Sequence, residues 1–546
     1  MQLCLESIRA KLGIYTAKNF FEYIRSRYLS FKGLGKCPAQ NRVLEDLVTE
    51  VSIKLRENPN ELWASQKFQL AFRVTKPEHL RILSVNGASQ REAERAVTAG
   101  RVMSLLPYNT LMGETTLKKF LPSMPEKFSG KWKHSIDPYG IFRDIDRIEA
   151  VDCSGNRIYL ATRKFPYAVL VNITEACHFG CDGCYKGSMV RTALSALAGV
   201  CLEYAEIKKQ LTTEEKRAVE QARLLTLWLN EHPEVDSVII SGGEPTLFSN
   251  QSLERIVSQF KSAEHVKVVR MCTSSLFQGM WYRIDDDFVK ILSDFKKETG
   301  KQFYVNAHVT DEFQLSAPEA KIAVDRLQNA GISVHLQMPI QEGINFRRED
   351  LEWTAEKLRR ISKQAYLLGV IPYKMIVDMH SPSHPDLTVP IETFTRAVRC
   401  LDEHLINSDM ERWQACNLLH EQGNLYLYPH PHFTAIKEID KKRKRVIYFI
   451  PKKDSIHTYE EPLIIGHNDN PNSLSPIADS EICKRVDGVR EAYHSLRDEI
   501  RELETRSLTF EQKAREIEKF ERDFYKKSGI TFPENNPLIL KNEQPK

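Results

Sequence analysis

Several features are scarce or absent in this 546-residue chain. No stretch approaches the roughly 18 consecutive apolar residues of a membrane-spanning helix, and the first residues lack the apolar run of a secretory signal. Neither charge dominates, since 77 Lys and Arg oppose 73 Asp and Glu, so nucleic acid and an acidic membrane surface are not favoured as partners. The eleven cysteines are odd in number and mostly scattered, which argues against a disulfide framework and predicts a cytoplasmic protein.

What is present is an ordinary globular composition, 42% hydrophobic, which can bury a sizeable core. We expect four segments along the chain. They are a helical N-terminal region (1–130), a β-hairpin connector (131–165), a core (166–405) and a C-terminal extension (406–546) that ends in a helix pair. The hairpin is predicted from two β-rich runs that flank a turn at Gly155.

Within the core, apolar runs that are typical of buried strands alternate with amphipathic helical segments. The predicted strands are 167–174, 235–241, 266–273, 302–309, 332–340 and 366–377. Two helix starts are predicted from capping boxes, Thr212 with Glu215 and Ser316 with Glu319. The pattern predicts an α/β fold, a partial parallel (β/α)6-type barrel with a helical N-terminal region and an α+β C-terminal extension. In such folds ligands bind at the carboxyl ends of the strands.

A cysteine triplet follows the first predicted strand, in the stretch TEACHFGCDGCYKG. Cys177, Cys181 and Cys184 have the spacing C-x3-C-x2-C. Thiolates are the ligands of iron–sulfur clusters, and three of them leave one iron of a four-iron cluster open to another ligand. The alternative is a structural zinc site, but zinc prefers four ligands, and His178 is an awkward fourth beside Cys177.

A glycine-rich turn follows the second predicted strand. It consists of Gly242, Gly243, Glu244 and Pro245. Glycines allow the backbone to approach a ligand closely, and a carboxylate can accept hydrogen bonds from an ammonium group. Both motifs therefore lie on the face of the predicted sheet where chemistry is expected.

With these motifs, over about residues 135–400, the sequence resembles the radical SAM superfamily and, within it, the lysine 2,3-aminomutase family. The resemblance implies a [4Fe–4S] cluster on the three cysteines, with S-adenosylmethionine (SAM) chelating the open iron and the glycine-rich turn orienting SAM. One electron, from a donor such as flavodoxin or ferredoxin, would cleave SAM. The products would be methionine and a 5′-deoxyadenosyl radical, which would abstract hydrogen from an amino-acid-like or peptide substrate.

The resemblance adds three residues to the SAM site and shows three departures. His308 and Gln337 match positions of polar SAM contacts, and Ser274 joins this set where the family has an arginine for the phosphate of pyridoxal phosphate (PLP). No glycine-rich segment with a PLP-binding lysine follows residue 400, so we predict a PLP-independent reaction. Gly183 stands where the family has an aromatic residue that touches adenine. The stretch 186–211 also looks longer than the family's segment there.

Two other functions remain open at this point, a PLP-dependent 2,3-aminomutase with a displaced lysine and a non-catalytic metal-binding protein. The remaining polar features are weaker signals. The residues concerned are His430 and His432, which share a strand face, Cys400, Cys416 and Cys483, which lack paired-ligand spacing, the basic run 441–445, and Asp378. We interpret the cysteines as buried thiols and the basic run as a solvated loop or strand end, and Asp378 as a cap or a pocket residue.

Overall fold

The structure is a computed structural model. It describes residues 87–98, 147–151, 155, 157–177, 204–377, 385–404, 413–420, 423–428, 435–452, 455–463 and 480–508, and isolated residues within 74–121, 179–184 and 512–526. None of the described helices is long and apolar enough to cross a membrane.

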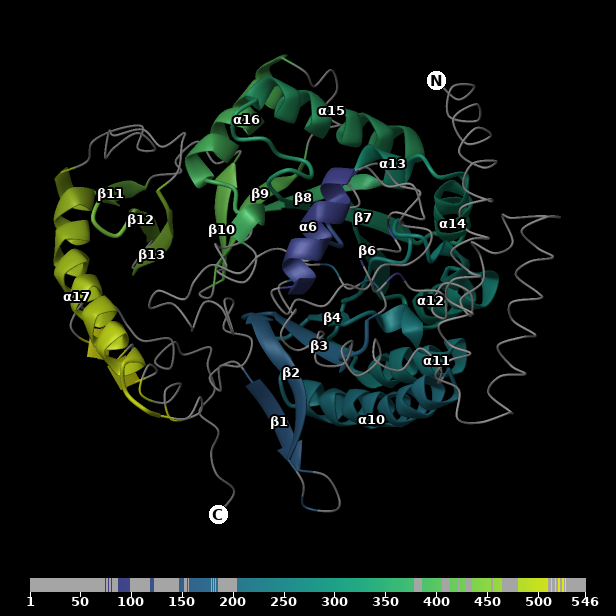
Figure 1. Ribbon diagram of the computed structural model, residues 1–546. Helices are drawn as coiled ribbons and strands as arrows, with labels where there is room; N and C mark the ends of the chain where they lie inside the picture. The colour runs from purple at the N-terminus through teal and green to yellow at the C-terminus, as the bar shows by residue number, and fades with distance from the viewer. Residues whose placement is uncertain are drawn as a thin grey trace, which may run out of the picture.

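A curved ten-stranded sheet forms the centre of the molecule (Figure 1). Its strands lie in chain order: β1 (Arg147–Val151), β2 (Arg157–Phe165), β3 (Ala168–Thr174), β4 (Ser237–Gly242), β5 (Val268–Thr273), β6 (Gln302–His308), β7 (Ser333–Ile340), β8 (Ile371–Val377), β9 (Ala415–His420) and β10 (Gly423–Tyr428). Strands β3 to β9 pair in parallel, whereas β1, β2 and β10 pair antiparallel at the two edges. The described strands β1 and β10 are not paired, so the barrel is partial, as predicted.

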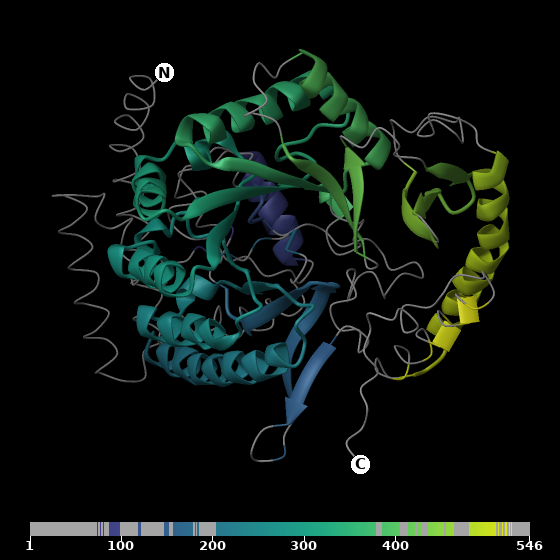
Figure 2. The ribbon, with the colours of Figure 1, turned by 180° about the vertical axis from the view of Figure 1, so that it is seen from behind.

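Helices cover the outer side of this sheet, which is clearest when the molecule is seen from behind (Figure 2). They are α10 (Tyr204–Asn230), α11 (Asn250–Gln259), α12 (Asp286–Thr299), α13 (Glu312–Leu315), α14 (Pro318–Asn329), α15 (Leu351–Leu368) and α16 (Ile391–His404). The six predicted strands correspond to β3 to β8, and the hairpin predicted around Gly155 is β1 with β2. Strands β9 and β10, which follow residue 405, join the same sheet.

Burial alternates along the strands and separates the two faces of the sheet. Val269 and Met271 on β5 and Phe303 and Val305 on β6 are fully or almost fully buried. Phe303 contacts Phe295 of α12 with the ring centroids 5.6 Å apart, so this face packs on the helices. The alternate residues, which are more polar and partly exposed, therefore face the inside of the curve.

Both predicted capping boxes were wrong. Helix α10 begins at Tyr204, so Thr212 lies inside it. Ser316 is the C-cap of the short helix α13, and α14 begins after Ala317 with a proline in its first turn. The capping box in this region belongs to α13 and consists of Asp311 with Gln314. A local Ser/Thr-x-x-Glu pattern does not say which of two adjacent helices it serves.

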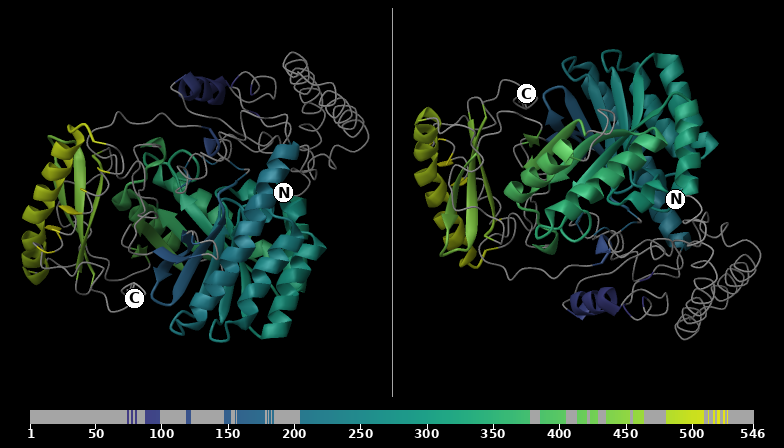
Figure 3. Two further views of the ribbon diagram at one scale, coloured as in Figure 1. Left: turned by 90° about the horizontal axis from the view of Figure 1, so that it is seen from below. Right: turned by 90° about the horizontal axis from the view of Figure 1, so that it is seen from above.

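The N-terminal region contributes helix α6 (Gly87–Thr98), which lies beyond one end of the barrel (Figure 3). Ala93 of this helix and the buried residues Phe120 and Leu121 belong to the same apolar cluster as the barrel strands. Most of the helical region predicted for residues 1–130 lies outside the described residues. The described part thus places some of this region against the core.

The C-terminal extension holds a second sheet of three antiparallel strands, β11 (Ile436–Asp440), β12 (Arg445–Lys452) and β13 (Ser455–Pro462). Helix α17 (Ser480–Glu504) packs on one face of this sheet through a separate apolar cluster. The other face joins the main core, where the buried Lys437 forms a 2.9 Å ion pair with Glu392 of α16. Residues 441–444 of the basic run form the turn between β11 and β12, and Arg445 begins β12, so the run lies in a loop and at a strand end.

Candidate active site at the carboxyl ends of the strands

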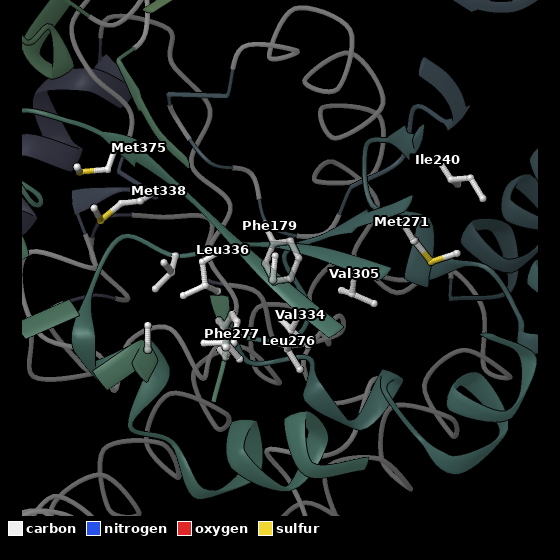
Figure 4. Packing of buried hydrophobic residues seen from close by; sticks show 14 of the residues in the cluster. Phe179, Ile240, Met271, Leu276, Phe277, Val305, Val334, Leu336, Met338 and Met375 are labelled. Atoms are coloured by element: carbon white, nitrogen blue, oxygen red, sulfur yellow. The ribbon is translucent and has the colours of Figure 1, made fainter. Parts of the chain in front are cut away.

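The cysteine loop follows β3 and is anchored by an aromatic side chain. Phe179 is 1% exposed and belongs to the same buried cluster as Val334 and Leu336 of β7 (Figure 4). Its backbone N–H donates to Sγ of Cys177 at 3.4 Å. The backbone N–H of Cys184 donates to the carbonyl of Cys181 at 3.3 Å. The burial of Phe179 ties the loop to the core, and the two hydrogen bonds link residues within the loop.

Burial controls the electrostatics of these thiols. It raises the pKa of Cys177 far above its ordinary value, with further increases from Cys181 and Glu244. It raises the pKa of Cys181 to about 11, although the charge of Lys119 lowers that value in part. Close to one another and away from water, these thiols are unfavourable to ionise, because the negative charges repel and are poorly solvated. A cationic metal centre that binds the thiolates removes this cost, and binding releases the protons. The donor set therefore suits a soft metal centre better than a charged thiolate nucleophile.

The three sulfur atoms are not gathered around a single point. Among the described residues, no group of three or more His, Cys, Asp or Glu side chains is arranged to hold one metal ion. In a four-iron cluster each thiolate binds a different iron, so the sulfur atoms surround a volume and need not converge as zinc ligands do. Three half-buried thiols on one loop, with no other ligand set beside them in the described part, fit such a cluster.

The glycine-rich turn packs directly on the backbone of the cysteine loop. The N–H of Gly243 donates to the carbonyl of Thr174 at 2.7 Å, and that of Glu244 donates to the carbonyl of Ala176 at 2.9 Å. A Cβ atom on Gly243 would lie 2.1 Å from the Ala176 oxygen, and one on Gly242 would lie 2.4 Å from the Thr174 oxygen. From the sequence we expected the glycines to let the backbone approach a ligand. In the structure they let the turn approach the backbone of the cysteine loop.

Glu244 is 1% exposed and is held by four hydrogen bonds. Its Oε1 accepts from Thr273 Oγ1 at 2.6 Å, from Thr246 Oγ1 at 2.8 Å and from the Thr246 N–H at 3.2 Å. Its Oε2 accepts from the Ser274 N–H at 2.8 Å. Burial raises the pKa of Glu244, and these bonds lower it in part. Because a carboxylate offers about four acceptor sites, Oε2 keeps capacity for a further donor.

The structure brings the predicted SAM-site residues together in two groups. Ser274 contacts Glu244 through its backbone, and Pro245 opens the short 3-10 turn that Glu244 caps. His308 and Gln337 pair on the adjacent strands β6 and β7, with Nε2 and Oε1 3.1 Å apart. Glu244 and Ser274 directly follow or lie close behind β4 and β5 and His308 ends β6, whereas Gln337 lies three residues before the end of β7.

Four residues of the site were missed by the sequence analysis. Thr246 and Thr273 hold Glu244, Gln278 accepts a long contact from the Cys181 thiol at 3.9 Å, and Gln341 lies against Gly183. Their only sequence signal is that polar residues follow β4, β5 and β7. The other positions singled out, His178, Asp378, His430, His432 and the stretch 186–203, lie outside the described residues.

A row of polar and aromatic side chains crosses the inner face of the barrel. The ring of His335 stacks on Tyr304 with centroids 4.5 Å apart, and Tyr373 lies 5.5 Å away on the other side. The guanidinium of Arg270 lies 5.9 Å from the Tyr304 centroid. Burial lowers the pKa of His335, and the charge of Arg270 lowers it further. These side chains give the interior hydrogen-bonding and cationic groups.

Acid should weaken the folded state through His335, because its folded-state pKa is lowered. The neutral imidazole contributes stability that is present above about pH 6.5 and is lost as the pH falls through the lower folded value. His335→Phe keeps an aromatic ring for stacking and removes this titration. We expect its melting temperature to fall less than that of the wild type between pH 7 and pH 5, as measured by circular dichroism. Tyr304→Phe, which leaves the imidazole in place, should keep the wild-type acid sensitivity, and an equal drop in all three proteins would contradict the assignment.

The fold and the site define a class, an α/β partial barrel with a cysteine-bearing loop after its first parallel strand. No family model matches the chain. Among curated proteins, it is 23% identical to the glutamate 2,3-aminomutase of Clostridioides difficile over 64% of this chain and 73% of that protein. It is 27% identical to the L-lysine 2,3-aminomutase of Bacillus subtilis over 34% of this chain and 33% of that protein. It is 24% identical to a protein of Aquifex aeolicus that carries the name of an L-lysine 2,3-aminomutase, over 43% of this chain and 56% of that protein.

The chain is therefore a distant sequence relative of the lysine 2,3-aminomutase family. The chain spans 56% of the length of the Aquifex aeolicus protein and 33% of the length of the Bacillus subtilis enzyme.

Proposed function

We propose that this protein is a radical SAM enzyme. Cys177, Cys181 and Cys184 would hold a [4Fe–4S] cluster. The observation that carries the proposal is the direct bonding of the glycine-rich turn to the cysteine loop, which makes the three thiols and the buried Glu244 parts of one site. When bound, the cluster and SAM would supply one-electron cleavage of SAM to a 5′-deoxyadenosyl radical.

The residues around the thiols would bind and orient SAM. Oε2 of Glu244 would accept a hydrogen bond from the ammonium group of SAM, since Thr246, Thr273 and the Ser274 N–H fix the carboxylate in place. The pair formed by His308 and Gln337 would offer further polar contacts. The barrel wall would exclude water and oxygen from the reaction.

The substrate would be amino-acid-like or a peptide, with hydrogen abstraction as the reaction class. This class of substrate is supported by the names of the relatives, which concern lysine and glutamate. We also propose that the reaction does not use PLP. Ser274 has no side chain that could clamp a phosphate as a bidentate arginine does. An electron donor such as flavodoxin or ferredoxin would supply the electron.

Anaerobic reconstitution with iron, sulfide, SAM and a chemical reductant tests this function. We expect about four irons and four sulfides per chain and release of 5′-deoxyadenosine, measured by chromatography. Bound zinc with no iron or sulfide would overturn the proposal in favour of a non-catalytic metal-binding protein. The visible absorbance of PLP in the purified protein would instead favour a PLP-dependent aminomutase.

A further inference from the structure

Two side chains fill the space beside the cysteine loop at Gly183. A Cβ atom on Gly183 would lie 2.2 Å from Nε2 of Gln341 and 2.8 Å from Cδ1 of Leu387. Gln341 directly follows β7, and Leu387 ends the short 3-10 turn Pro385–Leu387. Gln341 and Leu387 therefore occupy the space that a side chain at position 183 would need. Both lie more than 150 positions further along the chain.

The backbone of Gln341 is fixed by the turn that follows β7. Its N–H donates to Oδ1 of Asn345 at 2.9 Å, and its carbonyl accepts from the N–H of Ile344 at 3.2 Å. Asn345 Nδ2 donates in turn to the carbonyl of Pro339 at 2.9 Å. The N–H of Glu342 donates to the carbonyl of Leu387 at 3.2 Å, so the two wall residues are held in register.

The side chain of Gln341, by contrast, is incompletely paired. It is 3% exposed, and its Oε1 has no hydrogen-bond partner within the part of the chain that the structure describes. Leaving such a buried acceptor without a donor destabilises the folded state, and native proteins seldom do so. A buried amide oxygen that lacks a donor, held on a fixed turn beside an apolar leucine, supplies the acceptor and the apolar contact that an amine-bearing ring needs.

We propose that Gln341 recognises the adenine of SAM, with its Oε1 accepting a hydrogen bond from the exocyclic amine and Leu387 packing on the base. This inference rests on the proposed function. A glutamine amide matches adenine well, because its oxygen can accept from the amine at position 6. Gln341 and Leu387 thereby take over the adenine contact that an aromatic residue at position 183 would otherwise make.

The test compares SAM with an analogue in which hydrogen replaces the 6-amino group, by anaerobic equilibrium dialysis on the reconstituted protein. We expect the wild type to bind the analogue roughly tenfold more weakly than SAM. Gln341→Leu should bind SAM more weakly and should no longer distinguish the two compounds. Gln341→Glu keeps an acceptor oxygen and should retain the preference.

Gln221→Leu is the matched control. Gln221 is 2% exposed and donates to the carbonyls of Leu160 and Asn172, so this variant also loses buried amide bonds, but it should keep the wild-type preference. A wild type that loads iron and binds both compounds equally would overturn the inference alone, as would an unchanged preference in Gln341→Leu. A wild type that loads no iron and binds no SAM would overturn the inference together with the proposed function. The wild-type comparison decides the question even if the leucine variant does not fold.

Discussion

Replacing Cys181 by alanine is expected to abolish cluster assembly and the release of 5′-deoxyadenosine. Loss of a residue that merely supports a metal ligand typically costs 10- to 100-fold in metal affinity or activity, so loss of a ligand itself should exceed about a hundredfold. The fold should survive, because a half-buried protonated thiol behaves as a small apolar group and alanine has a similar shape. The raised pKa of Cys181, about 11, places it in that protonated state before metal binding.

Cys400→Ala provides the control for this result. Cys400 is a free, half-buried cysteine on α16 and is not part of the cysteine loop. That variant should load iron and release 5′-deoxyadenosine as the wild type does, with iron and sulfide measured per chain after identical anaerobic reconstitution. Normal product release by Cys181→Ala would refute the cluster assignment, whatever the control shows.

The barrel could be predicted because its signals are local and repeated. The runs that became β3 and β4 are buried along almost their whole length, those that became β5 to β8 carry a buried apolar face, and each run is followed by an amphipathic helix. Strands β9 and β10 carry no comparable alternation, and their place in the sheet depends on pairing with β8. The start of α10 at Tyr204 was missed because Thr212 sits in a helix that continues past a sequence typical of a helix start.

Only the part of the candidate site that directly follows predicted strands could be located from the sequence. The cysteine triplet and the glycine-rich turn follow neighbouring parallel strands, and the carboxyl ends of such strands meet at one edge. The contacts that complete the site join residues far apart in sequence. Thr273 bonds Glu244 from the next strand, and Gln341 reaches Gly183 from β7. Such pairs depend on how the sheet curves, which no motif in a single sequence encodes.

The direct contact between the two motifs makes Gly243 a second position of large effect. In Gly243→Ala the new Cβ would lie 2.1 Å from the carbonyl oxygen of Ala176 and 2.6 Å from its carbon. Both are backbone atoms, so no side chain can rotate away. Any shift that relieves the overlap must stretch the bond from the Glu244 N–H to the same oxygen and displace Cys177, which follows Ala176. We expect a loss of about 3 kcal/mol in the free energy of unfolding, the upper end of overpacking costs, and at least about tenfold less iron per chain.

Gly331→Ala separates this steric effect from the general cost of replacing a glycine. Gly331 has a φ of +74°, and the nearest atom to its added Cβ is Lys296 Nζ at 3.8 Å. Alanine there should cost only about 1–2 kcal/mol of left-handed backbone strain and should leave iron loading unchanged. Denaturant unfolding and iron analysis of both variants measure the difference. If Gly243→Ala unfolded and loaded iron as Gly331→Ala does, the cysteine loop and the glycine-rich turn would not be in the close contact from which the proposed function is argued.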